Sequence, residues 1–153
     1  MTSARTRAGF TLVELLVVLA IMGLVAAVVA PALRRLDRGD PRGGAEALAV
    51  VYTAASGTAV RRGVPVTVQL DLARGTYVVL ARSWTDAAAK TVRAGSLPLG
   101  PDERLTGGRD GWAAVTFDPF GQARGDAVVI ARGVERYEVT TDPWTAAVDV
   151  HAR

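Results

Sequence analysis

The sequence of 153 residues has few of the groups that catalytic and metal sites need. It contains no cysteine and one histidine, His151, near the C-terminus. Without cysteine there is no disulfide framework and no thiolate metal site. A general base needs positioned partners, and a single terminal histidine is typical of an exposed surface residue. A Gly-rich phosphate loop is also absent. We therefore expect no catalytic residue, no enzyme activity and no cofactor.

Acidic residues do not supply an obvious cation site either. Asp37 and Asp40 are close in sequence, as are Asp102 and Glu103. Neither pair has the spacing of an EF-type calcium loop, which supplies six or more oxygen ligands. A calcium site around Asp110 stays open as an alternative, although isolated acidic residues are usually solvated. No residue is therefore assigned as a metal ligand.

Charge is missing from one long stretch near the N-terminus. No charged residue occurs from Leu15 to Leu33. These nineteen residues in a helix would span roughly 28 Å, about the thickness of the hydrocarbon core of a bilayer. Glu14 stands at the start of the run, and Arg5 and Arg7 precede it. A charge within a membrane helix costs roughly 3 kcal/mol on insertion scales, so Glu14 is a candidate functional residue.

The stretch 9–16, Gly-Phe-Thr-Leu-Val-Glu-Leu-Leu, resembles the processing signature of type IV prepilins and type II secretion pseudopilins. This resemblance implies that a prepilin peptidase cuts after Gly9 and methylates the new amino group of Phe10. Glu14 then becomes the fifth residue of the mature chain, in the first helical turn, where the helix dipole favours a carboxylate. In those families the carboxylate pairs with the amino terminus of a neighbouring subunit in a growing filament.

A secretory signal peptide and a plain membrane anchor are the two alternatives for this stretch. A signal peptide explains the two leading arginines, but it places Glu14 inside an unusually long apolar region. A plain anchor gives no reason for Glu14. We therefore expect residues 1–9 to be a leader peptide and residues 10–33 to form a transmembrane and filament-core helix. Arg5 and Arg7 favour a cytoplasmic N-terminal side, which places the head in the periplasm and the anchor in the inner membrane.

Residues 34–62 are expected to continue as an amphipathic helix after an interruption. Pro31 removes a helix N–H and predicts a kink, and the resembled families carry a proline at the same place. Residues 33–44 are charged and rich in glycine and proline, which indicates a break. Apolar residues then recur at helical spacing up to Arg62, and Gly63 ends the pattern. The predicted inner face comprises Ala45, Leu48, Ala49, Tyr52, Ala55 and Ala59.

Residues 63–153 are expected to form a β-rich globular head. Strict alternation over residues 64–72 predicts a half-buried strand, which pairs in a hairpin with residues 76–81. Further strands are predicted over residues 112–117, 127–131, 137–140 and 145–150, with short ones in the loop-rich region at 90–93 and 97–99. The fold class is α+β and pilin-like: a long N-terminal transmembrane α-helix packed on a C-terminal antiparallel β-sheet or β-sandwich head.

Two further segments resemble the H-type minor pseudopilins and the FimT/FimU minor pilins. They are the alanine-rich helix and strand over residues 45–80 and the stretch 115–125, Val-Thr-Phe-Asp-Pro-Phe-Gly-Gln-Ala-Arg-Gly. The resemblance implies a minor pseudopilin of a type II secretion system, a structural subunit of the periplasmic pseudopilus that drives protein export across the outer membrane. Its partners would be a prepilin peptidase and other pseudopilins or pilins in a filament. The alternative is a minor pilin of a type IV pilus that binds DNA in natural transformation.

Charge gives little support to a nucleic-acid partner. The net charge of +3 falls to +1 when Arg5 and Arg7 leave with the leader. DNA binding needs clustered basic residues, whereas the candidates are interleaved with acidic ones. The basic candidates are Arg124, Arg132, Arg136 and Arg153, and the interleaved acidic residues are Asp126, Glu135, Glu138 and Asp142. We therefore expect an ordinary solvated surface, with DNA binding kept open.

Overall fold

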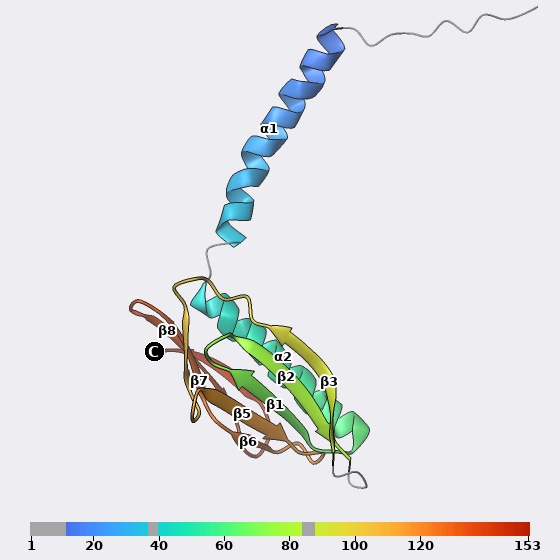
Figure 1. Ribbon diagram of the computed structural model, residues 1–153, viewed down its shortest axis with the longest axis vertical. Helices are drawn as coiled ribbons and strands as arrows, with labels where there is room; N and C mark the ends of the chain where they lie inside the picture. Colours follow the sequence, from blue (N-terminus) through green and yellow to red (C-terminus); the bar gives the residue numbers. More distant parts are fainter. Residues whose placement is uncertain (1–11, 37–39, 84–87) are drawn as a thin grey trace, which may run out of the picture. The chain divides into compact units, whose positions relative to one another are not determined.

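The computed structural model describes residues 12–36, 40–83 and 88–153, and within the first helix it describes side chains from Leu12 to Leu24 (Figure 1). The chain divides into two units, Met1–Arg38 and Gly39–Arg153. The first unit contains helix α1, and the second contains helix α2 and strands β1 to β9.

Helix α1, Leu12–Leu36, is apolar on all sides over the part whose side chains are described. Every side chain from Leu12 to Leu24 is exposed, and Glu14 lies in the first turn. A helix that is hydrophobic all round is normally covered by other apolar groups. The backbone remains helical through Pro31, whose side chain lies outside those described, so the expected kink is not tested. Among the described residues, no helix is both long and apolar enough to cross a membrane.

Helix α2, Pro41–Arg62, has a capping residue at each end. The carboxylate of Asp40 accepts a hydrogen bond from the N–H of Arg42 at 3.0 Å, and Pro41 occupies the first turn, where its missing N–H costs nothing. At the other end Gly63 adopts a left-handed conformation with φ 64°, and its N–H bonds to the carbonyl of Ala59. The predicted end of this helix is confirmed.

The start of α2 differs from the expectation, because its glycines lie inside the helix and not in a break. The helix begins four residues before Ala45, and Gly43 and Gly44 belong to its first turn. Gly44 is buried, and a Cβ there would lie 3.1 Å from a methyl group of Leu99 and 3.4 Å from one of Ile130. The absence of a side chain therefore lets this end of the helix approach the sheets closely.

Five antiparallel strands form one sheet, in the order β3-β2-β1-β5-β6. The predicted hairpin is confirmed, because its two strands pair from Val66↔Ala81 to Asp71↔Thr76. The predicted strand over 112–117 is also confirmed. The five strands are β1 Val66–Asp71, β2 Thr76–Arg82, β3 Ala89–Ser96, β5 Trp112–Phe117 and β6 Ala123–Gly125.

Four antiparallel strands form a second sheet, in the order β4-β7-β8-β9. They are β4 Arg104–Gly107, β7 Val128–Arg132, β8 Glu135–Thr141 and β9 Val148–Ala152. Helix α2 contacts β1 and β5 of the first sheet and β7, β8 and β9 of the second. The core lies between these three layers, and the rings of Tyr52 and Phe117 meet there with centroids 5.9 Å apart. The expected α+β architecture is confirmed.

Several short elements were predicted incorrectly. Residues 97–99 are not a strand; Leu97 is apolar because it is buried as part of a loop, with its N–H bonded to the carbonyl of Gly75. Strands β4 and β6, of four and three residues, were missed, because so few residues show no clear alternation. The last strand begins at Val148 and not at Thr145, since Ala146 has a φ of 52° within the preceding turn.

We predict that Tyr52→Phe will leave the protein equally stable or make it more stable by up to about 1 kcal/mol. Tyr52 is 1% exposed, and among the described residues its hydroxyl has no hydrogen-bond partner. Burial, with a smaller contribution from Asp126, raises the pKa of this hydroxyl, so it stays neutral at ordinary pH. Urea unfolding of the full-length chain in detergent measures the change. Tyr52→Ala, which leaves a cavity, should cost about 3–5 kcal/mol. A clear loss of stability in the phenylalanine variant would contradict the prediction.

Candidate functional site

The residues expected to undergo processing, Gly9 and Phe10, lie outside the described residues. Glu14 is the only charged residue between Leu12 and Leu24. Its immediate neighbours are largely exposed: Leu12 is 76% exposed and Leu16 58%. A carboxylate therefore stands in the first turn of a helix whose other described side chains are uncharged. This arrangement is suited to an apolar surrounding that supplies one positive charge.

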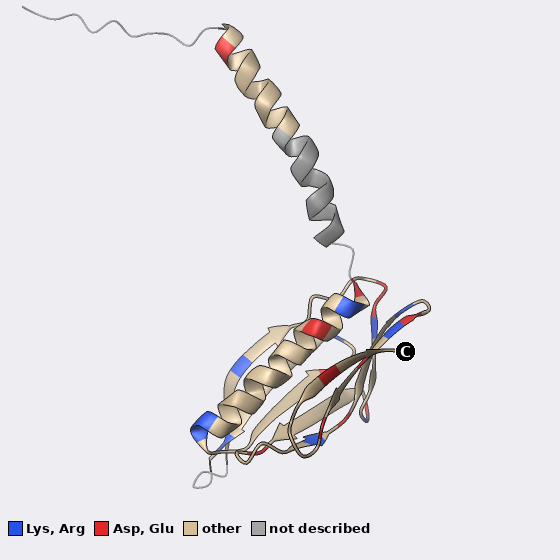
Figure 2. Ribbon diagram, turned by 180° about the vertical axis from the view of Figure 1, so that it is seen from behind, with Lys and Arg blue, Asp and Glu red and all other residues tan. Residues whose placement is uncertain are grey.

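The outward face of α2 is a second surface without charge. No Asp, Glu, Lys or Arg occurs from residue 47 to residue 60, which is most of the helix. Figure 2 shows this as a long tan stretch of the α2 ribbon between charged residues near its ends. We call the exposed or half-exposed residues on this side the uncharged face of α2. They are Val50, Thr53, Ala54, Gly57 and Val60.

The uncharged face of α2 is unlike the outer surface of an ordinary helix in water, which carries charged and polar side chains. Val50 is 65% exposed and Val60 54%. The hydroxyl of Thr53 donates to the carbonyl of Ala49 at 2.8 Å, and another threonine hydroxyl of the helix bonds its own backbone in the same way. Because these hydroxyls are bonded within the helix, an apolar partner can cover the face without leaving them unsatisfied.

Charges lie at both ends of the uncharged face, and two of the arginines contact side chains of the same helix. Arg42 forms an ion pair with Glu46, with Nε and Oε1 2.8 Å apart. Arg61 donates to the hydroxyl of Thr58 at 3.3 Å. The uncharged face is therefore roughly 15 Å long between Val50 and Val60, by the rise of the helix. A smooth face of that length with small residues is suited to contact with another helix.

The acidic residues and the histidine take structural or exposed positions. Asp40 caps α2, and Glu103 accepts a hydrogen bond from the N–H of Gly100 at 3.0 Å. Asp110 occupies a tight turn with a φ of 53°, and His151 is exposed on β9. Asp37 lies outside the described residues. In the part of the chain that the structure describes, no three His, Asp or Glu side chains group in a way that could hold a metal ion.

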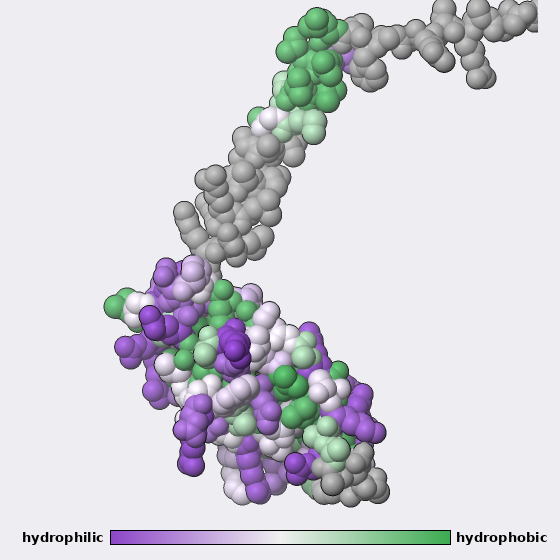
Figure 3. Space-filling model, viewed as in Figure 1, coloured by the Kyte–Doolittle hydropathy of each residue, from purple (hydrophilic) through white to green (hydrophobic). Residues whose placement is uncertain are grey.

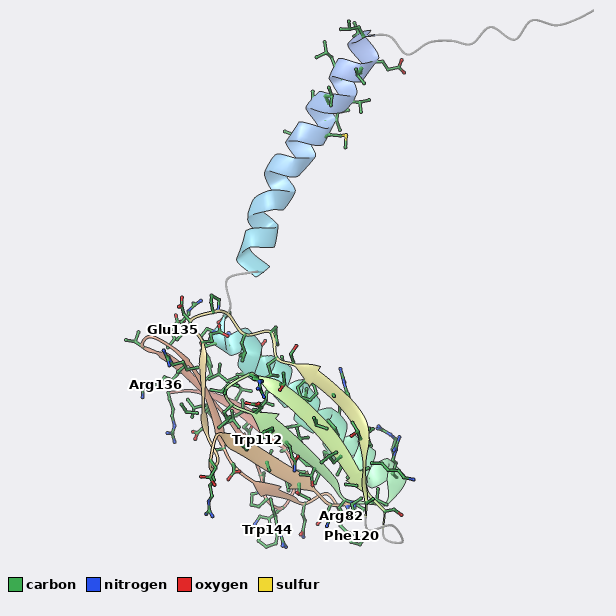
Figure 4. The ribbon with its side chains drawn as sticks, viewed as in Figure 1. Arg82, Trp112, Phe120, Glu135, Arg136 and Trp144 are labelled. Atoms are coloured by element: carbon green, nitrogen blue, oxygen red, sulfur yellow. The ribbon has the colours of Figure 1, made fainter. Side chains whose placement is uncertain are left out.

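Three of the four candidate DNA-binding arginines lie in the second sheet. Arg132 and Arg136 belong to the β7–β8 hairpin, and the N–H of Arg153, just after β9, bonds to the carbonyl of Arg136. Figure 4 labels Arg136 beside Glu135 in this hairpin. Two of the three are paired with acidic side chains: Arg153 with Glu138 at 2.7 Å, and Arg132 with Glu135 at 3.5 Å. Arg124 lies on β6, in the other sheet. The arrangement therefore lacks the unpaired basic cluster that binding to phosphates requires.

These features define a pilin-like protein: an apolar N-terminal helix, followed by a helix packed on antiparallel sheets. Residues 4–30 match the prokaryotic N-terminal methylation motif, and residues 44–151 match the family described as type II transport protein GspH. The chain belongs to the GspH family. Members of this family are type II transport proteins that act as structural subunits and not as enzymes. The methylation motif implies processing by a prepilin peptidase, and family membership implies assembly with other pseudopilins.

Two solved structures have similar folds. The minor pseudopilin EpsH from the type 2 secretion system of Vibrio cholerae is 12% identical, with a TM-score of 0.55 over 71% of this chain and 93% of EpsH. The type IV minor pilin FimU of Pseudomonas aeruginosa is 11% identical, with a TM-score of 0.56 over 73% of this chain and 91% of FimU. A search among curated proteins finds no match.

The C-terminal hairpin turn is organised by one carboxylate. Asp142 accepts hydrogen bonds from the N–H groups of Trp144 and Thr145, at 2.9 and 2.8 Å, and from the hydroxyl of Thr145 at 2.9 Å. These bonds lower the pKa of Asp142, the N–H of Thr145 having the largest effect. Trp144 is left 77% exposed at this turn (Figure 4).

We predict that this turn loosens at acid pH. A carboxyl group with a lowered folded-state pKa contributes stability above its unfolded-state value, about 3.9, and that contribution is lost as the pH falls through the folded-state pKa. Amide exchange protection of Trp144 and Thr145, measured by NMR, should therefore fall between neutral pH and about pH 2. Asp142→Asn should remove this pH dependence, and the buried Val139 amide of β8 is the internal control. Unchanged protection in the wild-type chain would contradict the role of Asp142.

Proposed function

We propose that this chain is a structural subunit of the periplasmic pseudopilus and acts through surfaces that other subunits cover. Two helix surfaces support this: the apolar, exposed part of α1 and the uncharged face of α2. The observation on which the proposal depends most is Glu14 in the first turn of α1, followed by uncharged side chains as far as Leu24. Residues 10–33 would anchor the subunit and enter the filament core. Residues 34–62 would continue as the helix that packs on the sheets, and residues 63–153 would form the β-rich part of the periplasmic head.

Processing after Gly9 would create a positive charge with which Glu14 of another subunit can pair. Removal of residues 1–9 gives Phe10 a free amino terminus, and methylation of that amine leaves its positive charge in place. A carboxylate surrounded by apolar groups is stable only with a partner of opposite charge. The amino terminus of a neighbouring subunit would supply it, so one pair of charges would fix the position of each new subunit in an otherwise featureless apolar contact. Pro31 would adjust the direction of the helix beyond this contact.

We predict that Glu14→Ala will allow membrane insertion and cleavage after Gly9 but lower incorporation into the pseudopilus at least tenfold. Removal of one member of a buried ion pair costs about 3–5 kcal/mol, which exceeds the 1.4 kcal/mol that corresponds to tenfold. Incorporation is measured as the share of the subunit in sheared filaments relative to the membrane fraction. Val17→Ala, on the same helix, is the matched control. Normal incorporation of the glutamate variant would contradict the ion-pair proposal.

We also predict that Val50→Glu on the uncharged face of α2 will reduce secretion in a strain that lacks the chromosomal gene. The readout is the division of a normally secreted enzyme between periplasm and medium. The matched control is Val134→Glu, a residue 93% exposed in the turn between β7 and β8. Both substitutions lie at the surface, so each should change stability by no more than about 0.5 kcal/mol. Equal secretion by the two variants would show that this face is not covered in the assembly.

A type IV minor pilin is the second candidate, because the fold is also similar to that of FimU. The two candidates share processing, helix contacts and head architecture, so these features do not distinguish them. The difference is whether the subunit works in a secretion system or in a pilus. Deletion of the gene distinguishes them. Retention of secreted enzymes in the periplasm, restored by the wild-type gene and not by a Gly9 variant, supports the pseudopilin. Normal secretion with loss of surface pili supports the pilin.

A further inference from the structure

The outer side of the five-stranded sheet is a surface that the helix contacts do not use. Strand alternation places Val66, Val68 and Leu70 of β1 in the core, where they are fully buried, while Thr67 and Gln69 face the other way. The front of the head in Figure 3 is this side, where pale and green residues over β1 and β2 lie among purple, hydrophilic ones. We call it the outer sheet face. Its central members are Thr67, Gln69, Val78, Leu80, Ala114 and Thr116.

The outer sheet face is hollowed along β1. One depression, of about 500 Å³, is lined by Thr67, Leu80, Arg82 and other residues of the sheet. A second, of about 180 Å³, is lined by Trp112 and Ala114 among others. Gln69 lines both, so the two depressions are neighbours along β1, and together we call them the groove. The six residues of β1 beneath it span roughly 20 Å, which is the length of an extended segment of about six residues.

The middle of the groove carries no charge and few unsatisfied polar groups. The hydroxyls of Thr67 and Thr116, which face each other across β1 and β5, are 2.9 Å apart and hydrogen-bonded. Leu80 and Val78 are half-buried on the same side. Covering this surface with another protein should cost little free energy. Among its central members only the amide of Gln69 is both exposed and polar, and a polypeptide backbone can form hydrogen bonds with it.

The two ends of the groove differ. Trp112, 51% exposed, lies opposite Asp71 at one end. Two arginines lie at the other end. Arg82 is the last residue of β2 and follows the Val66↔Ala81 pair. Arg124 of β6 lies opposite Thr116 of β5. Within the described residues neither arginine forms an ion pair. Figure 4 shows Trp112 and Arg82 well separated along the sheet.

The first sheet has an excess of basic residues in a head that is neutral as a whole. Residues 40–153 contain thirteen basic and thirteen acidic residues. The five strands of the first sheet, however, contain four basic residues and one acidic residue, Asp71. Asp71 is 7% exposed, accepts hydrogen bonds from the N–H groups of Ala73 and Arg74, and pairs with the Arg74 side chain. The basic residues of the sheet are Arg82, Lys90, Arg93 and Arg124. Lys90 and Arg93 lie opposite the buried Ala81 and Val79, so only Arg82 and Arg124 belong to the outer side.

We propose that the outer sheet face binds an extended acidic segment of another protein. Carboxylates of the segment would meet Arg82 and Arg124, and an apolar side chain would pack on Trp112. Tryptophan and arginine are the side chains that most often dominate protein interfaces, especially around an uncharged centre. A polypeptide fits better than DNA, because the floor is uncharged and only two arginines border it, whereas binding to a phosphate backbone uses many basic contacts.

The test uses the full-length chain in a neutral detergent and a fluorescein-labelled peptide of about twelve residues in which glutamate alternates with leucine or threonine. Fluorescence anisotropy should show saturable binding at about 0.05 M salt that weakens at about 0.5 M, because the arginine contacts are exposed. A peptide with lysine in place of each glutamate should not bind. Arg82→Glu should weaken binding at least tenfold, Arg82→Gln by less, and Trp112→Ala about fivefold with the same dependence on salt.

The matched control is Arg136→Glu, an exposed arginine of the second sheet, which should leave binding unchanged. Circular dichroism of each variant verifies that it is folded. Failure of the glutamate peptide to bind, equal binding of the lysine peptide, or equal losses in Arg82→Glu and Arg136→Glu would each overturn the proposal. Tighter binding of duplex DNA that Arg82→Glu abolishes would also overturn it. None of these outcomes depends on filament assembly, so they leave the proposed pseudopilus role unaffected.

Discussion

The head depends on one contact: the packing of the inner face of α2 against two sheets that, among the described residues, no strand pairing joins. The five-stranded and four-stranded sheets have separate hydrogen-bond ladders, and α2 contacts strands of both. Leu48 and Tyr52 are buried at this contact, and a fully buried large apolar side chain contributes about 1.5–3 kcal/mol. Ala45, Ala55 and Ala59, also buried, let the helix backbone approach the strands closely. Loss of this contact would therefore separate the layers as well as expose the helix.

The inner and outer faces of α2 have different structural roles. Its inner face, of alanine with a few large side chains, builds the head. Its outer face has no charged residue from 47 to 60, although it is exposed in the single chain. A helix that only covered a sheet would be expected to carry charged residues on the side facing water. The absence of charge on that side is therefore best explained by a second partner, as expected of a subunit that functions in an assembly.

Much of this architecture follows from local patterns in the sequence. Alternation over 64–72 and 76–81 predicted the central hairpin, and the three- and four-residue spacing from Ala45 predicted the buried face of α2. The patterns failed where tertiary contacts decide. Gly44 was interpreted as part of a break, but it is helical because Leu99 and Ile130 pack against it. Strands β4 and β6 are too short to show a period, and pairing with longer neighbours holds them in place.

The candidate surfaces were predictable to different degrees. The motif around Glu14 was recognised from residues adjacent in sequence. The uncharged face of α2 was also visible there, as fourteen successive residues without charge, but the prediction concentrated on the buried face. The outer sheet face was not predictable, because Gln69, Leu80, Trp112 and Thr116 come together only through the pairing of β1 with β2 and β5.

The uncharged face of α2 and the outer sheet face meet one physical requirement in the same way. In both, the exposed threonine hydroxyls are bonded within the protein, so a partner can cover them without an unsatisfied group. They differ in shape. The face of α2 is the surface of one helix, made of small and branched side chains, whereas the sheet face is hollowed along β1, with Trp112 at one end and Arg82 at the other. Another helix therefore suits the first surface, and an extended segment suits the second. This difference in shape would keep the two partners of one small head from exchanging places.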